Sequence, residues 1–168
     1  MLDSKIITLL KLEKPGSYTK APHELHLTQP AISRHIRLLE EELGIKIFQH
    51  GTKKLLPTHE GKILLRYAHR LMAISQKAVQ AIEDERRHAR HLVIGITQTA
   101  SENIIPQVIA QYCNENPDTH ITLITDTINN LYKHLELFEV DIAVTEGAPP
   151  EGVSYQSVLL DTDYLCLI

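Results

Sequence analysis

The sequence predicts two differently built halves, a mainly helical first half and an alternating α/β second half. In residues 1–90, apolar residues recur at helical spacings between capping and breaking residues. In residues 91–168, continuous apolar runs alternate with amphipathic segments, as in a parallel sheet with crossover helices. Charge divides at the same place. The first half holds 16 of the 17 Lys and Arg against 10 acids, a net +6, and the second holds one Lys against 11 acids, a net −10.

Three helices are predicted before residue 45. Residues 3–13 form the first, residues 19–25 a short second, and residues 28–43 the third. Thr28 is a cap for the third helix, and Gly44 closes it in a left-handed conformation. A brace helix followed by a tight turn and a second amphipathic helix is the arrangement of a helix-turn-helix.

A hairpin and a long helix follow. Residues 45–48 and 53–56 are short extended runs around a Gly turn, which predicts a β-hairpin. Thr58 caps a helix over 58–87, and a charged run at 83–91 is the expected linker. The apolar positions of this helix alternate at spacings of three and four, as in a coiled coil. They are Leu64, Tyr67, Leu71, Ile74, Ala78 and Ala81. We predict a dimer helix, the alternative being a long core helix of one domain.

The second half predicts a parallel sheet with helices between its strands. The expected strands are 92–96, 121–125 and 140–144, the expected helices are 101–114 and 127–138, and further strands are expected at 153–160 and 164–168. The first of these helices should bury one apolar face. Its predicted inward residues are Ile104, Ile105, Val108, Ile109 and Tyr112.

The outward face of helix 28–43 carries side chains that suit the major groove of DNA. Gln can read adenine edges, Arg can read guanine or hold phosphate, and basic hairpin residues suit the backbone. The predicted contacts to double-stranded DNA are Thr28, Gln29, Pro30, Ser33, Arg34 and Arg37 on the helix, with His50, Lys53 and Lys54 on the hairpin. The alternative for the arginines is a solvated helix face. Glu40-Glu41-Glu42 is predicted to be a solvated helix end.

Hydroxyl groups gather where the strands of the predicted sheet end. Ligands of parallel α/β sheets bind beyond the carboxyl ends of the strands, near helix N-termini. The candidate ligand-binding residues there are Thr97, Thr99, Ser101, Thr125 and Thr145. Hydroxyls and N–H groups at a helix start suit a carboxylate. The alternative is that Thr99 or Ser101 merely caps its helix.

The sequence resembles the LysR-type transcriptional regulators along essentially its whole length. In the first half the shared pattern is Thr19-Lys20-Ala21, Leu25, Leu27-Thr28-Gln29-Pro30-Ala31-Ile32-Ser33, Ile36, Leu39-Glu40, Leu43-Gly44, Phe48, Pro57-Thr58 and Gly61. In the second half it is Leu92-Val93-Ile94-Gly95, Ile105-Pro106, Tyr112, Asn116-Pro117, Leu137 and Asp141-Ile142-Ala143-Val144. Three positions depart from the family pattern, namely Pro22, His50 and Pro57.

The resemblance implies a fold of class α + α/β. A winged helix-turn-helix would span 1–57, a linker and dimerisation helix 58–90, and an incomplete effector-binding α/β lobe like a periplasmic binding protein 91–168. It also implies a cytoplasmic regulator that forms a homodimer or homotetramer, binds promoter DNA, and in its full-length form responds to a small co-inducer, a carboxylate being one candidate. No cofactor, metal or membrane contact is expected. Thr97, Thr99 and Ser101 match the family's effector loop.

Other interpretations of the sequence compete with that of a complete LysR-type regulator. The chain stops at Cys166-Leu167-Ile168, which the resemblance places in mid-strand, so we expect either a fragment or the product of a truncated gene. We expect this chain alone to bind co-inducer poorly or not at all. An enzyme is disfavoured, since His23 and His26 lack the spacing of a HExxH zinc site. Cys113 and Cys166 are isolated and are expected to be free thiols. A truncated coiled-coil interaction protein without regulated DNA binding remains the alternative function.

Overall fold

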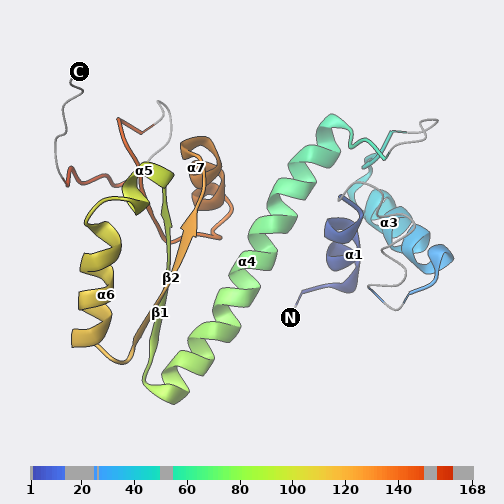
Figure 1. Cartoon of the computed structure of the whole chain (residues 1–168). Helices are drawn as coiled ribbons and strands as arrows, with labels where there is room; N and C mark the ends of the chain where they lie inside the picture. Colours follow the sequence, from blue (N-terminus) through green and yellow to red (C-terminus); the bar gives the residue numbers. More distant parts are fainter. Residues whose placement is uncertain (1, 14–24, 26, 50–54, 150–154, 161–168) are drawn as a thin grey trace.

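The computed structural model describes residues 2–13, 25, 27–49, 55–149 and 155–160, and the fold is drawn in Figure 1. Its elements are α1 (Ser4–Glu13), α3 (Gln29–Leu43), α4 (His59–Arg87), β1 (Arg90–Ile96), α5 (Gln98–Ser101), α6 (Ile105–Glu115), β2 (Thr119–Thr125), α7 (Ile128–Glu136) and β3 (Ile142–Val144). The predicted helix over 19–25, apart from Leu25, lies outside the described residues. No helix in the described ranges is long and apolar enough to cross a membrane.

The helices α1, α3 and α4 share one hydrophobic core. Its fully buried side chains come from each of these helices and from the segment that follows α3. They are Leu9, Leu12, Ile32, Ile36, Leu39, Ile47, Phe48, Leu65 and Ala68. α1 and the first turns of α4 therefore hold one face of α3 and leave its other face to solvent.

The sequence signals at both ends of α3 are confirmed. The Thr28 hydroxyl accepts a hydrogen bond from the Ala31 N–H group at 3.4 Å, and Pro30 occupies the first turn. Gly44 ends the helix with φ at 66°, and its N–H group donates to the Glu40 carbonyl. A left-handed residue at this position favours glycine because it has no Cβ atom.

The base of the predicted hairpin is present, and its tip lies outside the described residues. Phe48 and Pro57 form an antiparallel bridge, and the Gln49 N–H group donates to the Leu56 carbonyl at 2.8 Å. In the described part, this bridge replaces the longer strands expected over 45–48 and 53–56. Residues 50–54, with the expected contacts His50, Lys53 and Lys54, are not described.

The long helix is confirmed, and the linker after it is shorter than expected. The Thr58 hydroxyl accepts from the Gly61 N–H group at 2.9 Å and so caps α4. α4 continues to Arg87 and β1 begins at Arg90, so most of the predicted 83–91 linker is helix or strand. The turn between them is made by His88, whose φ is 53°, and by Ala89.

β1, β2 and β3 form a parallel sheet in the order β2-β1-β3. Ile96, near the end of β1, lies beside Thr125 of β2 and Val144 of β3, so all three strands end at one edge. In Figure 1, α6 lies on one face of the sheet, and α7 lies on the other face, on the side of α4. The predicted strand-helix-strand-helix-strand order is therefore correct, although β3 is shorter than the expected 140–144.

Two expectations about the second half are wrong. Residues 155–160 form no strand, because no described strand pairs with this apolar run. The helix expected over 101–114 is broken into α5 and α6, and only Ile105 and Ile109 of its predicted inward residues pack against the sheet core. The other three, Ile104, Val108 and Tyr112, are exposed, Ile104 by 61%.

Candidate nucleic-acid interface and effector pocket

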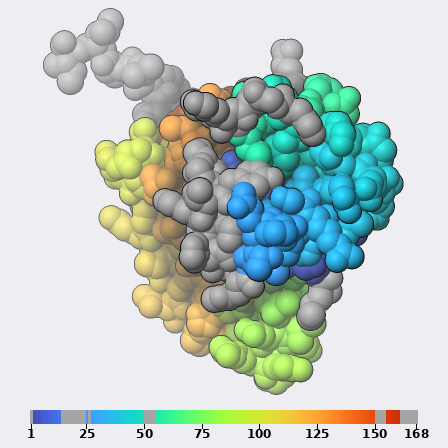
Figure 2. Space-filling view, turned by 90° about the vertical axis from the view of Figure 1, so that its right-hand side faces the viewer, coloured from blue at the N-terminus to red at the C-terminus, as the bar shows by residue number. Residues whose placement is uncertain are grey.

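The predicted DNA-contacting face of α3 is exposed in the structure. Gln29, Pro30, Ser33, Arg34 and Arg37 are all accessible to solvent, while Ile32 and Ile36 on the opposite side are buried. Figure 2, viewed from the side of the molecule on which α3 lies in Figure 1, shows this part of the chain, in blue, at the surface. The amphipathic pattern of α3 therefore positions one amide, one hydroxyl and two guanidinium groups on one accessible side.

The positive charge of this face is partly neutralised by an ion pair within α3. The Nε atom of Arg37 lies 3.4 Å from Oε1 of Glu41, one turn along the helix. Both side chains are more than half exposed, so this ion pair contributes little to stability and can open at small cost. Arg37 thus remains available for a phosphate or a base edge.

The expectation that Glu40 belongs to a solvated helix end is wrong, because its carboxylate is buried and bonded. Glu40 is 9% exposed, and its Oε1 atom accepts a hydrogen bond from the Ile47 N–H group at 2.9 Å. The other oxygen, Oε2, accepts one from the Lys46 ammonium at 2.8 Å. Glu40 thereby ties α3 to the first arm of the hairpin. The signal lay in its position beside Leu39 on the buried side of α3.

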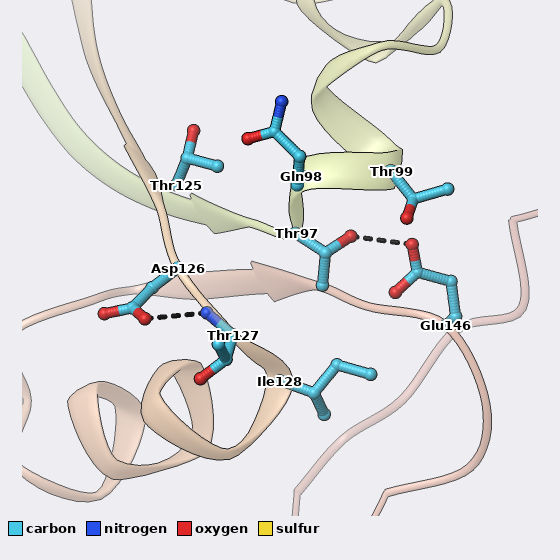
Figure 3. A pocket seen from close by; sticks show the side chains of 8 residues that line it. All are labelled: Thr97, Gln98, Thr99, Thr125, Asp126, Thr127, Ile128 and Glu146. Carbon is cyan, nitrogen blue, oxygen red and sulfur yellow. Dashed lines mark hydrogen bonds between the residues drawn. The ribbon is translucent and has the colours of Figure 1, made fainter.

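A second candidate site is a pocket at the edge where the three strands end (Figure 3). Its volume is about 400 Å³. The strand order β2-β1-β3 places this edge beside a point where successive connections leave in opposite directions, which is where α/β sheets bind ligands. The pocket is lined by Thr97, Gln98, Thr99, Thr125, Asp126, Thr127, Ile128 and Glu146.

Three of the five predicted effector residues line this pocket, and two do not. Thr97, Thr99 and Thr125 are lining residues. Ser101 instead donates from its hydroxyl to the Gln98 carbonyl at 2.6 Å, and the Thr145 hydroxyl lies 3.3 Å from that of Tyr132. Neither Thr99 nor Ser101 caps α5, since the buried Thr97 does so by accepting from the Ala100 N–H group.

Two carboxylates, which the sequence analysis did not select, also line the pocket. Glu146 accepts a hydrogen bond from the Thr97 hydroxyl at 2.7 Å, and Asp126 accepts one from the Thr127 N–H group at 2.7 Å (Figure 3). The Asn130 amide and then this N–H group lower the pKa of Asp126. Several donors expected to receive a carboxylate ligand are therefore already paired within the chain.

His134 connects Asp126 to the far end of α7. Its Nδ1 atom lies 2.6 Å from Oε2 of Glu139, and its Nε2 atom lies 3.4 Å from Oδ2 of Asp126. The hydrogen bond to Glu139, and then the one to Asp126, raise the pKa of His134. Within the described ranges, no group of three or more His, Cys, Asp or Glu side chains could hold a metal ion.

Comparisons with known proteins assign both halves to one family. The model of the bacterial regulatory helix-turn-helix protein of the LysR family matches residues 4–62, and the model of the LysR substrate binding domain matches residues 85–168. A relative from Porphyra purpurea, named "Probable RuBisCO transcriptional regulator", is 31% identical over 93% of this chain and 49% of its own length. One of the same name from Cyanophora paradoxa is 33% identical over 89% of this chain and 46% of its own length.

Solved structures show the same fold at low sequence identity. The crystal structure of CbnR, a LysR family transcriptional regulator, matches 90% of this chain and 51% of its own with a TM-score of 0.70 and 17% identity. Full-length CbnR complexed with its target DNA matches 90% and 52% with a TM-score of 0.71 and 18% identity. The chain spans about half the length of the relatives that it matches. The chain belongs to the LysR family of transcriptional regulators.

Proposed function

We propose that this chain binds promoter DNA sequence-specifically through α3 and belongs to a cytoplasmic regulator that responds to a small molecule. The observation that carries the proposal is the division of α3 into a buried apolar side and an accessible side with Gln29, Ser33, Arg34 and Arg37. This is the build of a recognition helix. Thr28 serves chiefly as its cap, and His50, Lys53 and Lys54 are proposed to hold phosphates as part of a wing.

The proposed working unit is a homodimer, or a homotetramer assembled from such dimers. Along α4, apolar side chains remain about half exposed at spacings of four and three: Tyr67 at 50%, Leu71 at 49% and Ile74 at 50%. The stripe continues through the exposed Ala78 and Ala81. Two copies of α4 packed along this stripe would bury it in coiled-coil fashion. Leu64, the first predicted seam residue, instead packs against the core of the first half.

The pocket at the end of the sheet is proposed to be one wall of the effector site. Thr97, Thr99 and Thr125 line it, and Ser101 and Thr145 lie nearby as weaker candidates. The lobe's parallel sheet supports a fold like that of a periplasmic binding protein. We place the working boundaries at 1–57 for DNA binding, 58–90 for the linker helix and 91–168 for the effector lobe. A carboxylate co-inducer stays one candidate among others.

Selection from a random pool of DNA duplexes tests the proposed function. The chain should enrich a partly palindromic sequence, and Arg37→Ala should bind that duplex more weakly by about 1–3 kcal/mol if Arg37 reads a base. Lys133→Ala, in the effector lobe, is the control and should bind normally. Failure to enrich any sequence would favour the interaction protein. Unchanged binding of Arg37→Ala would remove Arg37 from the recognition surface.

A further inference from the structure

The middle of α4 contacts the effector lobe at the segment that joins α7 to β3, residues 136–141, here called the α7–β3 turn. Arg66 and Arg70 approach its first residue, Glu136, and Lys77 forms an ion pair with its last residue, Asp141. Asp141 is also fixed from within the lobe, because its Oδ2 atom accepts from the Val93 N–H group at 2.8 Å. Both ends of the turn are therefore bound to the linker helix.

Arg70 makes the most specific of these contacts. Its Nε atom donates to the Glu136 carbonyl at 2.8 Å, and its Nη2 atom donates to Oε1 of the same residue at 2.9 Å. The guanidinium carbon also lies 5.2 Å from the centre of the Tyr67 ring and 5.9 Å from that of Phe138. A planar fork that binds backbone, carboxylate and aromatic faces together can be provided by arginine but not by lysine.

The turn that Arg70 contacts has a constrained backbone. Phe138 has φ at 60°, a left-handed conformation that is costly for a bulky residue and persists only where neighbouring contacts enforce it. The turn is also bonded to its neighbours: the Glu139 N–H group donates to the His134 carbonyl of α7 at 2.9 Å, and the Asp141 N–H group donates to the Val93 carbonyl of β1 at 2.8 Å. The turn therefore presents a fixed shape to α4.

The same helix, α7, joins this turn to the pocket. Thr127 and Ile128 line the pocket at the beginning of α7, and Glu136 is its last residue. His134 bonds Glu139 and lies beside Asp126 at the pocket wall, which adds a polar link between the two ends. A short packed helix moves largely as a unit, so a shift at its beginning is expected to reach the turn.

We infer that Arg70 is a positioning residue that fixes the effector lobe on the linker helix by holding the α7–β3 turn, so that a ligand which displaces α7 changes how the lobe sits on α4. The second clause rests on the proposed effector pocket. The first clause stands without it, because the contacts are present in the chain by itself.

The test compares Arg70→Ala with wild type in the absence of DNA and small molecules. Hydrogen exchange of the amides of residues 137–141 should become about tenfold faster, as expected when a charge-assisted hydrogen bond is lost. Spin labels on Lys62→Cys and Gln107→Cys, with Cys113 and Cys166 changed to Ser, report how the lobe sits on α4. Labelled chain is diluted with unlabelled chain so that only distances within one chain are measured. The distance distribution should broaden or shift in Arg70→Ala.

Three further variants keep the inference falsifiable if Arg70→Ala does not fold. Glu136→Ala leaves the carbonyl acceptor in place and should have a smaller effect in the same direction. Arg70→Lys should restore only part of the wild-type distance distribution, and Arg66→Ala, whose Nη1 lies 3.8 Å from Glu136, is the matched control with little effect. An unchanged distance distribution in Arg70→Ala and in Glu136→Ala overturns the inference, even if exchange is faster. Absence of effector binding by the wild-type chain would by itself refute only the proposed pocket.

Discussion

The two halves of the chain differ in how completely they bury their apolar residues. The helical half gathers buried side chains from α1, α3, α4 and the hairpin base into one core, while the apolar stripe along α4 stays exposed. In the lobe, a cluster of Ile94, Ile96 and Ala100 packs against α6, which still leaves Val108 and Tyr112 exposed. In the described ranges, 10 apolar residues are buried in the first half and five in the second, so the first half has the larger core.

Truncating one isoleucine in each half is expected to have the most unequal effects on stability. Ile32 on α3 is 0% exposed, whereas Ile104, at the cap of α6, is 61% exposed. Ile32→Ala should lower the free energy of unfolding by about 2–5 kcal/mol through lost burial and a cavity. Ile104→Ala should change it by about 0.5 kcal/mol or less. Urea titration followed by circular dichroism measures both, and similar losses would refute the proposed difference in burial.

One glycine in each half lies close to a neighbouring group, and the two groups differ in kind: backbone at Gly61 and a side chain at Gly95. A Cβ atom on Gly61 would lie 2.1 Å from the Ile47 carbonyl oxygen, and one on Gly95 would lie 2.6 Å from Cδ2 of Leu131. Backbone cannot yield as a side-chain tip can. Gly61→Ala should therefore destabilise by about 1–3 kcal/mol, although Ala is the better helix former. Gly95→Ala should cost less, and the reverse order in thermal unfolding would contradict this account.

Glu40 should matter to stability more than its neighbour Glu41. Glu40→Gln replaces an acceptor for the Lys46 ammonium and the Ile47 N–H group with an amide that can satisfy only one of them. We expect a loss of about 1–2 kcal/mol. Glu41→Gln, whose side chain is 60% exposed beside Arg37, should cost about 0.5 kcal/mol or less. Equal unfolding midpoints in urea for the two variants would show that Glu40 does not hold the hairpin to α3.

The smallest predicted effect is a dependence of the lobe's stability on pH. The pKa of His134 is raised above its ordinary value of 6.5, mainly by its hydrogen bond to Glu139. Folding therefore favours the protonated ring, and this stabilisation is complete below about pH 6.5 and is lost as the pH rises through the raised pKa. Asp126, whose pKa is lowered, stays charged in this window.

The dependence of the melting temperature on pH, measured for wild type and two variants, checks this expectation. Wild type should lose stability more steeply above pH 6.5 than His134→Gln, which cannot gain a proton. Arg34→Ala is a control for general loss of charge and should keep the wild-type slope. Parallel curves for wild type and His134→Gln would rule out His134 as the source of the pH dependence.

Local signals were sufficient for the parts of the fold that depend on neighbours in sequence. Thr28 and Thr58 cap α3 and α4 as expected, and Gly44 ends α3 as expected. The exposed face of α3 was also predictable, because one side of its helical pattern is apolar and the other is polar. The comparisons confirm the family and leave the individual contacts of this face as proposals.

Features that depend on distant segments were missed. α6 carries apolar residues on two sides, so periodicity could not show that Ile105 and Ile109 pack inward while Val108 stays exposed. Residues 155–160 are apolar enough for a strand, but a strand exists only where another strand pairs with it. The roles of Glu40 and Glu146 depend on partners seven and 49 residues away.

The central claim is that only the basic half contacts DNA. The salt dependence of binding tests this claim most directly. Affinity for the selected duplex is measured over a range of salt concentrations for wild type, Arg34→Ala and Lys133→Ala. If Arg34 holds a phosphate, the log–log slope of Arg34→Ala should be smaller by about 1, and the slope of Lys133→Ala should equal that of wild type. A wild-type slope in Arg34→Ala would remove Arg34 from the phosphate contacts, and a reduced slope in Lys133→Ala would contradict the claim.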